Sequence, residues 1–435
     1  MKRKYARWVE LAGRQSQLAL WSTFVKWVVL GGMVGLLSGS ASAIFLKSLD
    51  AVTRVRLEHG WLLFLLPVGG ALVSGMYMRF GKTSGKGNNL ILEQIQQGDE
   101  AIPLRMAPLV LIGTLITHLF GGSAGREGTA VQMGGSLADA LGRWLRINSL
   151  DRKILLMCGI SGGFGSIFGT PLAGTVFGLE VIAIGLISHK ALLPCFVASF
   201  TGDLVASRLW GVHHIHYQVD AFPGMDALVL VKVIAASIVF GLVSLLFSEL
   251  THYLKRTFTA IIRNPMLKSA TGGLIIIALV YIAGTRDYLG LGIPLISGSF
   301  TEDVHPFAFL WKLVFTAFTL GTGFQGGEVT PLFAIGATLG NSLAGVLHLY
   351  GPFLASLGFI AVFCGAVNTP IACFIMGIEL FGSGGAVYMF IACVISYLFS
   401  GHSGIYSSQL IGISKSALLP VPEGTTLAAV KELHK

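Results

Sequence analysis

TPLAGTVFGLEV at residues 170–181 and TPIACFIMGIEL at residues 369–380 are two copies of one pattern. Both copies begin with Thr-Pro and close on a glutamate at the same spacing. The matched residues are Thr170 with Thr369, Pro171 with Pro370, Ala173 with Ala372, Gly178 with Gly377 and Glu180 with Glu379. Proline suits the first turn of a helix, where its missing N–H costs nothing, so each copy predicts a helix start.

A second pattern repeats at nearly the same offset. GREGTAVQMGG (125–135) lies opposite GGEVTPLFAIG (326–336). The matched residues are Gly125 with Gly326, Glu127 with Glu328, Thr129 with Thr330 and Gly135 with Gly336. The chain therefore consists of two homologous halves. Two long membrane halves are typical of transporters, are often inverted relative to each other, and hold the substrate site at their interface.

The repeat divides the chain into five parts. We expect a cytoplasmic N-terminal segment at 1–19, a first membrane repeat at 20–208, a polar linker at 209–225, a second membrane repeat at 226–416 and a cytoplasmic C-terminal tail at 417–435.

The composition indicates an all-α polytopic membrane protein. Of 435 residues, 53% are hydrophobic and 12% charged, and the mean hydropathy is +0.75. Many apolar stretches approach the roughly 20 residues that a spanning helix needs. We expect on the order of ten to eighteen helical pieces, several broken near the bilayer midplane.

The net charge of +9 comes mainly from short basic runs beside apolar segments. This pattern follows the positive-inside rule and does not indicate nucleic-acid binding. It predicts a multi-pass protein of the inner (plasma) membrane with cytoplasmic termini. We read no removable signal peptide before the first span.

The second pattern predicts an anion site. Gly125 and Gly128 in one half, and Gly326 and Gly327 in the other, permit close backbone approach where a helix begins. The N–H groups at a helix start are unpaired and lie at its positive end, so they favour an anion.

Each acidic residue in these patterns has two interpretations. A glutamate in a first helical turn can simply stabilise the helix dipole. Within a membrane, an acidic residue costs about 2.5–3.5 kcal/mol on insertion scales and tends to mark an ion or proton path. We favour the second interpretation for Glu127 and Glu328 as gating and proton-coupling groups, and leave both open for Glu180 and Glu379.

The mechanism that follows is competition. An ionised Glu127 occupies the anion position at the helix starts as a tethered rival of the transported ion, and protonation releases it. Arg126 either holds the loop or contacts the anion; we favour the first. Lys86 either attracts anions or is a solvated loop residue, and we favour the solvated loop residue.

Cysteine and histidine give little functional signal. The five cysteines lie in apolar stretches without ligand spacing and are interpreted as buried thiols. His213, His214 and His216 are interpreted as part of a solvated loop rather than a metal site. We expect no metal and no cofactor.

At this point the chain resembles the CLC chloride channels and proton-coupled anion antiporters, homodimers with a pore and an inverted repeat in each subunit. GREGT stands where the family has GREGP, GGEVTP where it has GxFxP, and GIYSSQLI contains its late pore tyrosine as Tyr406. The resemblance implies that Glu127 is the gating glutamate and Tyr406 a pore-lining hydroxyl.

The departures point to one branch. TSGKGNNLI (83–91) replaces the chloride-type GSGIP, and Glu180 is followed by Val181 where chloride antiporters usually have a second glutamate. GNN, GREGT and GGEVTP together resemble the CLC-F fluoride/proton antiporters. In that branch the positions matching Asn88, Glu127, Glu328, Thr330 and Tyr406 are tied to selectivity, gating and coupling.

The predicted function is therefore proton-coupled fluoride export that confers fluoride resistance, with fluoride, protons and membrane lipid as partners. The amide of Asn88 and the hydroxyls of Thr330 and Tyr406 can donate to fluoride, although chloride would accept the same donors. A chloride- or nitrate-preferring antiporter or channel of the same fold is the alternative. No HExxH motif supports an enzyme, so a secondary active transporter is expected.

Overall fold

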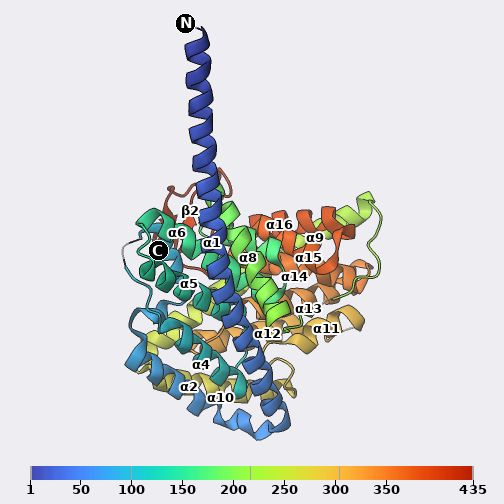
Figure 1. The fold of residues 1–435 in the computed structure, drawn as a ribbon. Coiled ribbons are helices and arrows are strands. Elements are labelled where there is room, and N and C mark those ends of the chain that lie inside the picture. The colour runs from blue at the N-terminus through green and yellow to red at the C-terminus, as the bar shows by residue number, and fades with distance from the viewer. Residues whose placement is uncertain (1, 99, 216, 303, 434–435) are drawn as a thin grey trace.

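The computed structural model describes residues 2–98, 100–215, 217–302 and 304–433. The chain is a dense helical assembly from which the N-terminal end of α1 projects (Figure 1). The helices of the first half are α1 (Lys2–Glu58), α2 (Leu66–Met76), α3 (Asn88–Gln96), α4 (Met106–Leu119), α5 (Glu127–Trp144), α6 (Ser149–Phe168), α7 (Pro171–Glu180) and α8 (Leu192–Leu204). Those that follow are α9 (Ala227–Ile261), α10 (Pro265–Ala283), α11 (Ile293–Thr301), α12 (Ala308–Gly321), α13 (Val329–Leu347), α14 (Gly351–Val367), α15 (Pro370–Phe381), α16 (Ala386–Phe399) and α17 (Leu427–Leu433).

The remaining regular segments are short. Three two-residue strands, β1 (Ala183–Ile184), β2 (Leu410–Ile411) and β3 (Thr425–Thr426), form one small sheet. Short 3₁₀ or π segments cover Gly60–Leu65, Tyr77–Gly81, Lys82–Lys86, His189–Ala191, Val205–Leu209 and Ser383–Gly385.

The helices confirm a multi-pass membrane protein. Six helical segments of the described chain are long and apolar enough to cross a membrane: Ser16–Glu58, Gly60–Gln96, His189–Leu209, Ala227–Ile261, Pro265–Ala283 and Val329–Leu347. Shorter apolar helices such as α4, α12 and α15 lie among them. The predicted mixture of full and partial spans is therefore present.

The two halves repeat the same packing. α5 packs on α6 as α13 packs on α14, and α1 packs on α8 as α9 packs on α16. Glycines permit the closest crossings: a Cβ on Gly134 would collide with the backbone of Gly159, and one on Gly336 with that of Gly358. Little hydrophobic force drives helices together inside a membrane, so their association depends on close van der Waals packing, which small residues permit.

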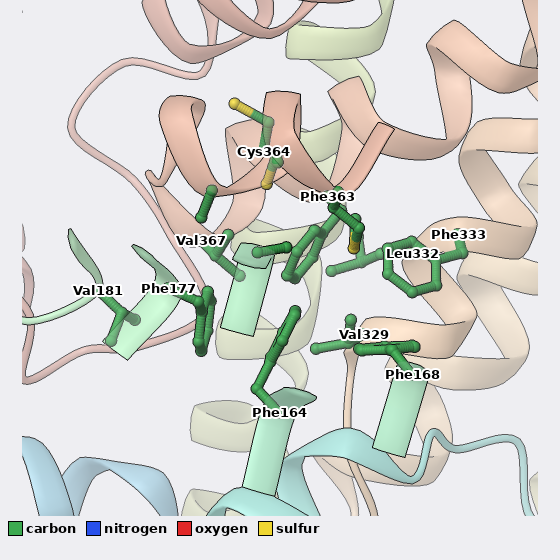
Figure 2. Packing of buried hydrophobic residues seen from close by; sticks show 14 of the residues in the cluster. Phe164, Phe168, Phe177, Val181, Val329, Leu332, Phe333, Phe363, Cys364 and Val367 are labelled. Carbon is green, nitrogen blue, oxygen red and sulfur yellow. The ribbon is translucent and has the colours of Figure 1, made fainter. Parts of the chain in front are cut away.

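An aromatic cluster joins the halves. Phe164 of α6 stacks on Phe177 of α7 at 4.2 Å between ring centroids, and its ring lies 6.2 Å from that of Phe363 in α14. Phe333 of α13 lies 5.2 Å from Phe168. Figure 2 shows these rings converging from both halves, so the core of the molecule is the interface between the repeats.

Each repeated Thr-Pro helix ends in a glutamate that caps the start of the other Thr-Pro helix. The Glu379 carboxylate accepts hydrogen bonds from the N–H groups of Leu172 (2.9 Å) and Ala173 (2.8 Å) at the start of α7. The Glu180 carboxylate accepts from Ile371 (3.2 Å) and Ala372 (2.9 Å) at the start of α15. Each helix thus ends where the other begins, as inverted repeats require, and both glutamates have a structural role.

Exposed and partly buried residues alternate along the segment 209–225, and several of its side chains pack on the helices. Tyr217 stacks on Phe300 at 5.1 Å, and Phe222 meets Phe353 edge-on. His213 is exposed, but the His214 side chain is only 10% exposed and lies 3.7 Å from Asp203. The solvated-loop interpretation is therefore wrong for His214, because Gly169 leaves room for its ring. His216 lies outside the described residues.

The segment after residue 416 folds back onto the core. β3 pairs antiparallel with β2, and β2 pairs parallel with β1 of the first half. Lys431 of α17 forms an ion pair with Glu249 of α9 at 2.7 Å. The residues expected as a tail thus brace the segment that carries Tyr406. The five cysteines are buried and free, as expected.

Candidate functional site

The two glycine-rich turns meet where α5 and α13 begin. The N–H of Gly125 donates to the carbonyl of Gly327 at 2.6 Å, and the N–H of Gly327 donates to the carbonyl of Gly125 at 2.8 Å. A Cβ on Gly125 would lie 2.9 Å from Cδ of Pro331, and one on Gly327 would lie 2.8 Å from the nitrogen of Gly128. Only glycine permits this approach, which brings two positive helix ends together.

Glu127 lies at this junction with no exposed surface. Its Oε2 accepts from the Thr330 N–H at 3.0 Å and from the Arg126 N–H at 3.1 Å. Its Oε1 accepts from the Thr330 hydroxyl. A carboxylate of the first half is thus bound at the first turn of a helix in the second half, in the manner of an anion at a helix start.

The Arg126 side chain lies beside the Glu127 carboxylate. Its Nε lies 3.5 Å from Oε1 of Glu127, and its side chain is 16% exposed. The guanidinium therefore adds positive charge beside the carboxylate at a distance that is long for a hydrogen bond. Arg126 thus lies beside a carboxylate, and its loop-holding role stays a prediction.

A polar cavity of about 290 Å³ adjoins the junction. We call it the vestibule; Asn88, Glu328 and Tyr406 line it, together with Gly326. The Oδ1 atom of Asn88 has no hydrogen-bond partner among the described residues.

Gly128 lies between two of these side chains. A Cβ on Gly128 would be 3.1 Å from Nδ2 of Asn88 and 3.8 Å from Oε2 of Glu328. An amide and a carboxylate are thus gathered where α5 begins. The site residues named from the sequence therefore occupy one region, with Glu127 and Thr330 inside the junction and Asn88, Glu328 and Tyr406 at its polar side.

The Tyr406 segment is fixed by neighbours from both halves. The Ser408 N–H donates to Oδ1 of Asn89 at 3.0 Å, and the Gln409 amide donates to the carbonyls of Val181 (2.9 Å) and Val367 (3.0 Å). Tyr406 itself is 4% exposed. Asn89 thus holds the segment that follows Tyr406.

Sequence reasoning missed several vestibule residues. Gln132, His252, Lys255 and Lys268 also line the cavity. Gln132 could have been found as a polar residue inside GREGTAVQMGG. Lys255 and Lys268 belong to the basic stretch 252–268, which was interpreted only through the positive-inside rule. Lys86 lines the cavity edge, is exposed, and forms an ion pair with Glu93 at 2.7 Å.

The arrangement suits ion exchange better than bond-making chemistry. A buried carboxylate held by backbone and hydroxyl donors lies next to a polar cavity that carries excess positive charge. Such a group can exchange its place with an anion and can bind or release a proton.

Comparisons with known proteins identify the family of the chain. The sequence profile of the family described as voltage gated chloride channel matches residues 69–401. A chloride/fluoride channel protein of Pseudomonas syringae pv. tomato is 50% identical over 97% of this chain and 94% of its own length. An H⁺/Cl⁻ exchange transporter of Cronobacter sakazakii is 28% identical over 88% of this chain and 89% of its own length.

Solved structures give the same result. The crystal structure of a CLC-type fluoride/proton antiporter superposes with a TM-score of 0.86 at 36% identity, covering 88% of this chain and 98% of that one. A slow cyanobacterial Cl⁻/H⁺ antiporter shares the fold, with a TM-score of 0.78 at 18% identity over 94% of this chain and 97% of that one. With its inverted repeat, its paired helix starts and these relatives, the chain belongs to the CLC family of ion-transport proteins.

Proposed function

We propose that this CLC protein is a secondary active transporter that exports fluoride in exchange for protons. The observation that carries the proposal is the Glu127 carboxylate, which accepts hydrogen bonds from the N–H and hydroxyl of Thr330 at the first turn of α13. The resemblance of GNN, GREGT and GGEVTP to the fluoride branch supports the choice of anion. So does the likeness to a structure described as a CLC-type fluoride/proton antiporter.

The proposed cycle alternates two occupants of one site. When ionised, Glu127 occupies the junction and excludes a free anion. Protonation removes the charge, weakens its bonds to Thr330 and Arg126, and lets fluoride take the helix-start position. Each release of the carboxylate therefore couples proton uptake to anion movement.

Fluoride must exchange strongly held water for close hydrogen-bond donors. Nδ2 of Asn88 and the hydroxyl groups of Thr330 and Tyr406 are the donors that we assign to this task. Gly125 and Gly128 complete the site by admitting the anion close to the backbone. Arg126 contributes charge through its contact with Glu127.

We assign the proton path to Glu127 together with Glu328. Val181 follows Glu180, and Glu180 is occupied in capping α15, so Glu180 is a poor internal relay. Glu328 faces the vestibule beside Asn88. A Glu127 side chain that moves toward the vestibule would meet Glu328 or Thr330 first.

We further propose an inner-membrane location with cytoplasmic termini and a homodimeric assembly. The basic segment near the N-terminus follows the positive-inside rule, and the family resemblance implies the dimer. Fluoride export from such an orientation would confer fluoride resistance on a bacterium that lacks another exporter.

The deciding experiment uses purified protein in liposomes, with fluoride and chloride efflux followed by ion-selective electrodes and proton movement followed in parallel. We expect fluoride efflux to exceed chloride efflux and to drive protons in the opposite direction. Chloride efflux as fast as fluoride efflux contradicts the fluoride assignment and favours the chloride alternative, which the name of the Pseudomonas relative also suggests. Fluoride efflux without proton movement contradicts antiport.

A further inference from the structure

One side of α9 borders the vestibule with hydrogen-bond donors. Ser248, Thr251 and Lys255 all line this cavity. They are three and four residues apart, so they lie along one side of the helix over about 10 Å, at a rise of about 1.5 Å per residue. We call these three residues the α9 stripe. They carry two hydroxyl groups and one ammonium group, which can all donate hydrogen bonds.

The two hydroxyl groups of the α9 stripe have no partner within the chain that the structure describes. Ser248 is 1% exposed, and its Oγ and the Oγ1 of Thr251 are buried without a hydrogen bond to any described residue. A hydroxyl inside a helix often bonds the carbonyl four residues earlier, as Ser237 does with Val233 at 2.6 Å. Buried polar atoms are normally paired, so these two groups point to a partner inside the cavity.

Lys255 lies where three cavities meet. It lines the vestibule and two outer cavities of about 680 Å³ and about 280 Å³. The other lysine and arginine residues that line the outer cavities are Lys82, Lys86, Arg256 and Lys431. Of these three cavities, the two hydroxyl residues of the stripe line only the vestibule. The α9 stripe therefore leads from the mouth of the vestibule toward its interior.

The charges around the stripe favour an anion. Lys255 is exposed and forms no hydrogen bond or ion pair with a described residue. Lys268 of α10 adds a second positive charge, and its Nζ donates to the Thr259 hydroxyl at 3.1 Å. Glu328 is the one carboxylate among the described residues that line the vestibule. A cavity with an excess of one sign of charge raises the local concentration of the opposite ion.

We propose that the α9 stripe, with Lys268 beside it, is an entry site that holds the transported anion before it reaches the Glu127 junction. Lys255 attracts the anion to the mouth of the vestibule, and the hydroxyl groups of the stripe replace part of its water. The inference rests on the proposed function, because that function supplies the ion. It adds the side chains that set how strongly the ion is captured, and it leaves the exchange at the junction unchanged.

The charge is tested by removing it at one position. Lys255→Met removes the ammonium group and keeps the length of the side chain. Lys232→Met removes the same charge about 35 Å away on α9 and is the matched control. Fluoride efflux from liposomes is measured over a range of internal fluoride concentrations, with the ionic strength held constant by sodium gluconate. A single pH is used, because Glu328 and His252 of the vestibule also titrate.

We expect Lys255→Met to raise the fluoride concentration for half-maximal efflux by roughly fivefold at an ionic strength of about 20 mM. At about 300 mM the increase should be less than about twofold, because salt screens exposed charges. The maximal rate and the ratio of protons to fluoride ions should not change. An equal effect of Lys232→Met contradicts the proposal, and so does a changed proton ratio, which would mean that Lys255 acts on Glu328 instead.

The hydroxyl groups are tested by Ser248→Ala and Thr251→Val, which leave the charge of the vestibule unaltered. We expect each variant to raise the half-maximal fluoride concentration by roughly threefold at both ionic strengths, because salt does not screen the loss of a hydrogen bond. Ser237→Ala removes a hydroxyl that is bonded within its own helix and should have no effect. If Ser248→Ala and Thr251→Val both behave like Ser237→Ala, water alone satisfies the two hydroxyl groups and the entry site does not exist.

A chemical rescue separates the charge of Lys255 from its bulk. The five native cysteines are buried, so Lys255→Cys offers an accessible thiol to a thiosulfonate reagent added before reconstitution. Attachment of a trimethylammonium group should restore capture at low ionic strength, and attachment of a sulfonate group of similar size should weaken it further. Equal results with the two reagents overturn the proposal.

Chloride efflux is measured in parallel with every variant. If the unchanged protein prefers chloride, the fluoride assignment fails, but the effect of Lys255→Met should then appear with chloride. If Lys255→Met has no effect on the preferred anion at low ionic strength, the entry site is wrong and the proposed function is untouched.

Discussion

The starts of α5 and α13 correspond in the repeat, yet their glutamates differ in surroundings. Glu127 turns into the junction and is bound by Thr330. Glu328 lines the vestibule. The threonines differ as well, since the Thr129 hydroxyl bonds Thr114 at 2.8 Å while the Thr330 hydroxyl bonds Glu127.

The Thr-Pro helices show the opposite behaviour. Glu180 and Glu379 make the same contacts in exchanged positions. The repeat is therefore symmetric where it builds the fold and asymmetric where we propose that ions pass. Four predictions, which use six substitutions, test this distinction from the largest expected effect to the smallest.

Glu127→Gln keeps the size of the side chain and fixes it in a neutral state. We expect proton movement coupled to fluoride to fall to the background of protein-free liposomes, while fluoride movement persists. The measurement is simultaneous electrode recording of fluoride and pH. A variant that still pumps protons uphill against a fluoride gradient contradicts the gating role of Glu127.

Glu328→Gln is the matched change in the other half. We expect coupling to weaken by roughly fivefold without disappearing, because the carboxylate assists a path that begins at Glu127. The ratio of protons to fluoride ions moved is the readout. Equal losses in Glu127→Gln and Glu328→Gln would show that the two positions are functionally symmetric after all.

Thr330→Val removes the hydroxyl that bonds Glu127 and keeps the volume of the side chain. The same hydroxyl is assigned as a donor to fluoride, and hydrogen bonds to charged groups contribute about 1.5–3 kcal/mol, so we expect exchange to slow by at least roughly tenfold. Thr129→Val is the control from the other half and should change the exchange rate by less than about twofold, because its bond is to Thr114 and is neutral. Similar slowing in both variants contradicts a special role for Thr330.

Glu180→Gln and Glu379→Gln each weaken a helix cap. We expect each to destabilise the protein by about 1 kcal/mol, read as similar decreases in the thermal unfolding midpoint in detergent. Proton coupling should be unchanged. A selective loss of coupling in Glu180→Gln would restore that residue as an internal proton relay.

Much of the fold was predictable because the same sequence patterns occur in both halves of the chain. The repeated prolines and glycines mark helix starts and close crossings, which depend on local chemistry. Glu127 was identifiable because a carboxylate between glycines in an apolar chain is expensive. The hydrogen bonds that Glu127 accepts from Thr330 could not be predicted, because they depend on the contact of two turns that are far apart in the sequence.

Other features had no local signal. Lys312 lies in an apolar run, and nothing in the sequence indicates that Ser123 and two carbonyls surround its ammonium group. The packing of Tyr217 and Phe222 was missed because their segment is polar and lacks periodicity. Tertiary contacts, rather than composition, decide the burial of such residues.

The pairing of β3 with β2 has a consequence for the order of assembly. Tyr406 lies shortly before β2, whose two partner strands are far apart in the sequence, with Ile184 opposite Ile411 and Ile411 opposite Thr425. Because a ribosome makes the chain from its N-terminus, Leu427 and Ala428 bond the backbone of Gln409 and Ser407 only after both membrane halves have been synthesised. The wall of the vestibule is therefore completed last, and a partly made chain lacks the support that fixes Tyr406.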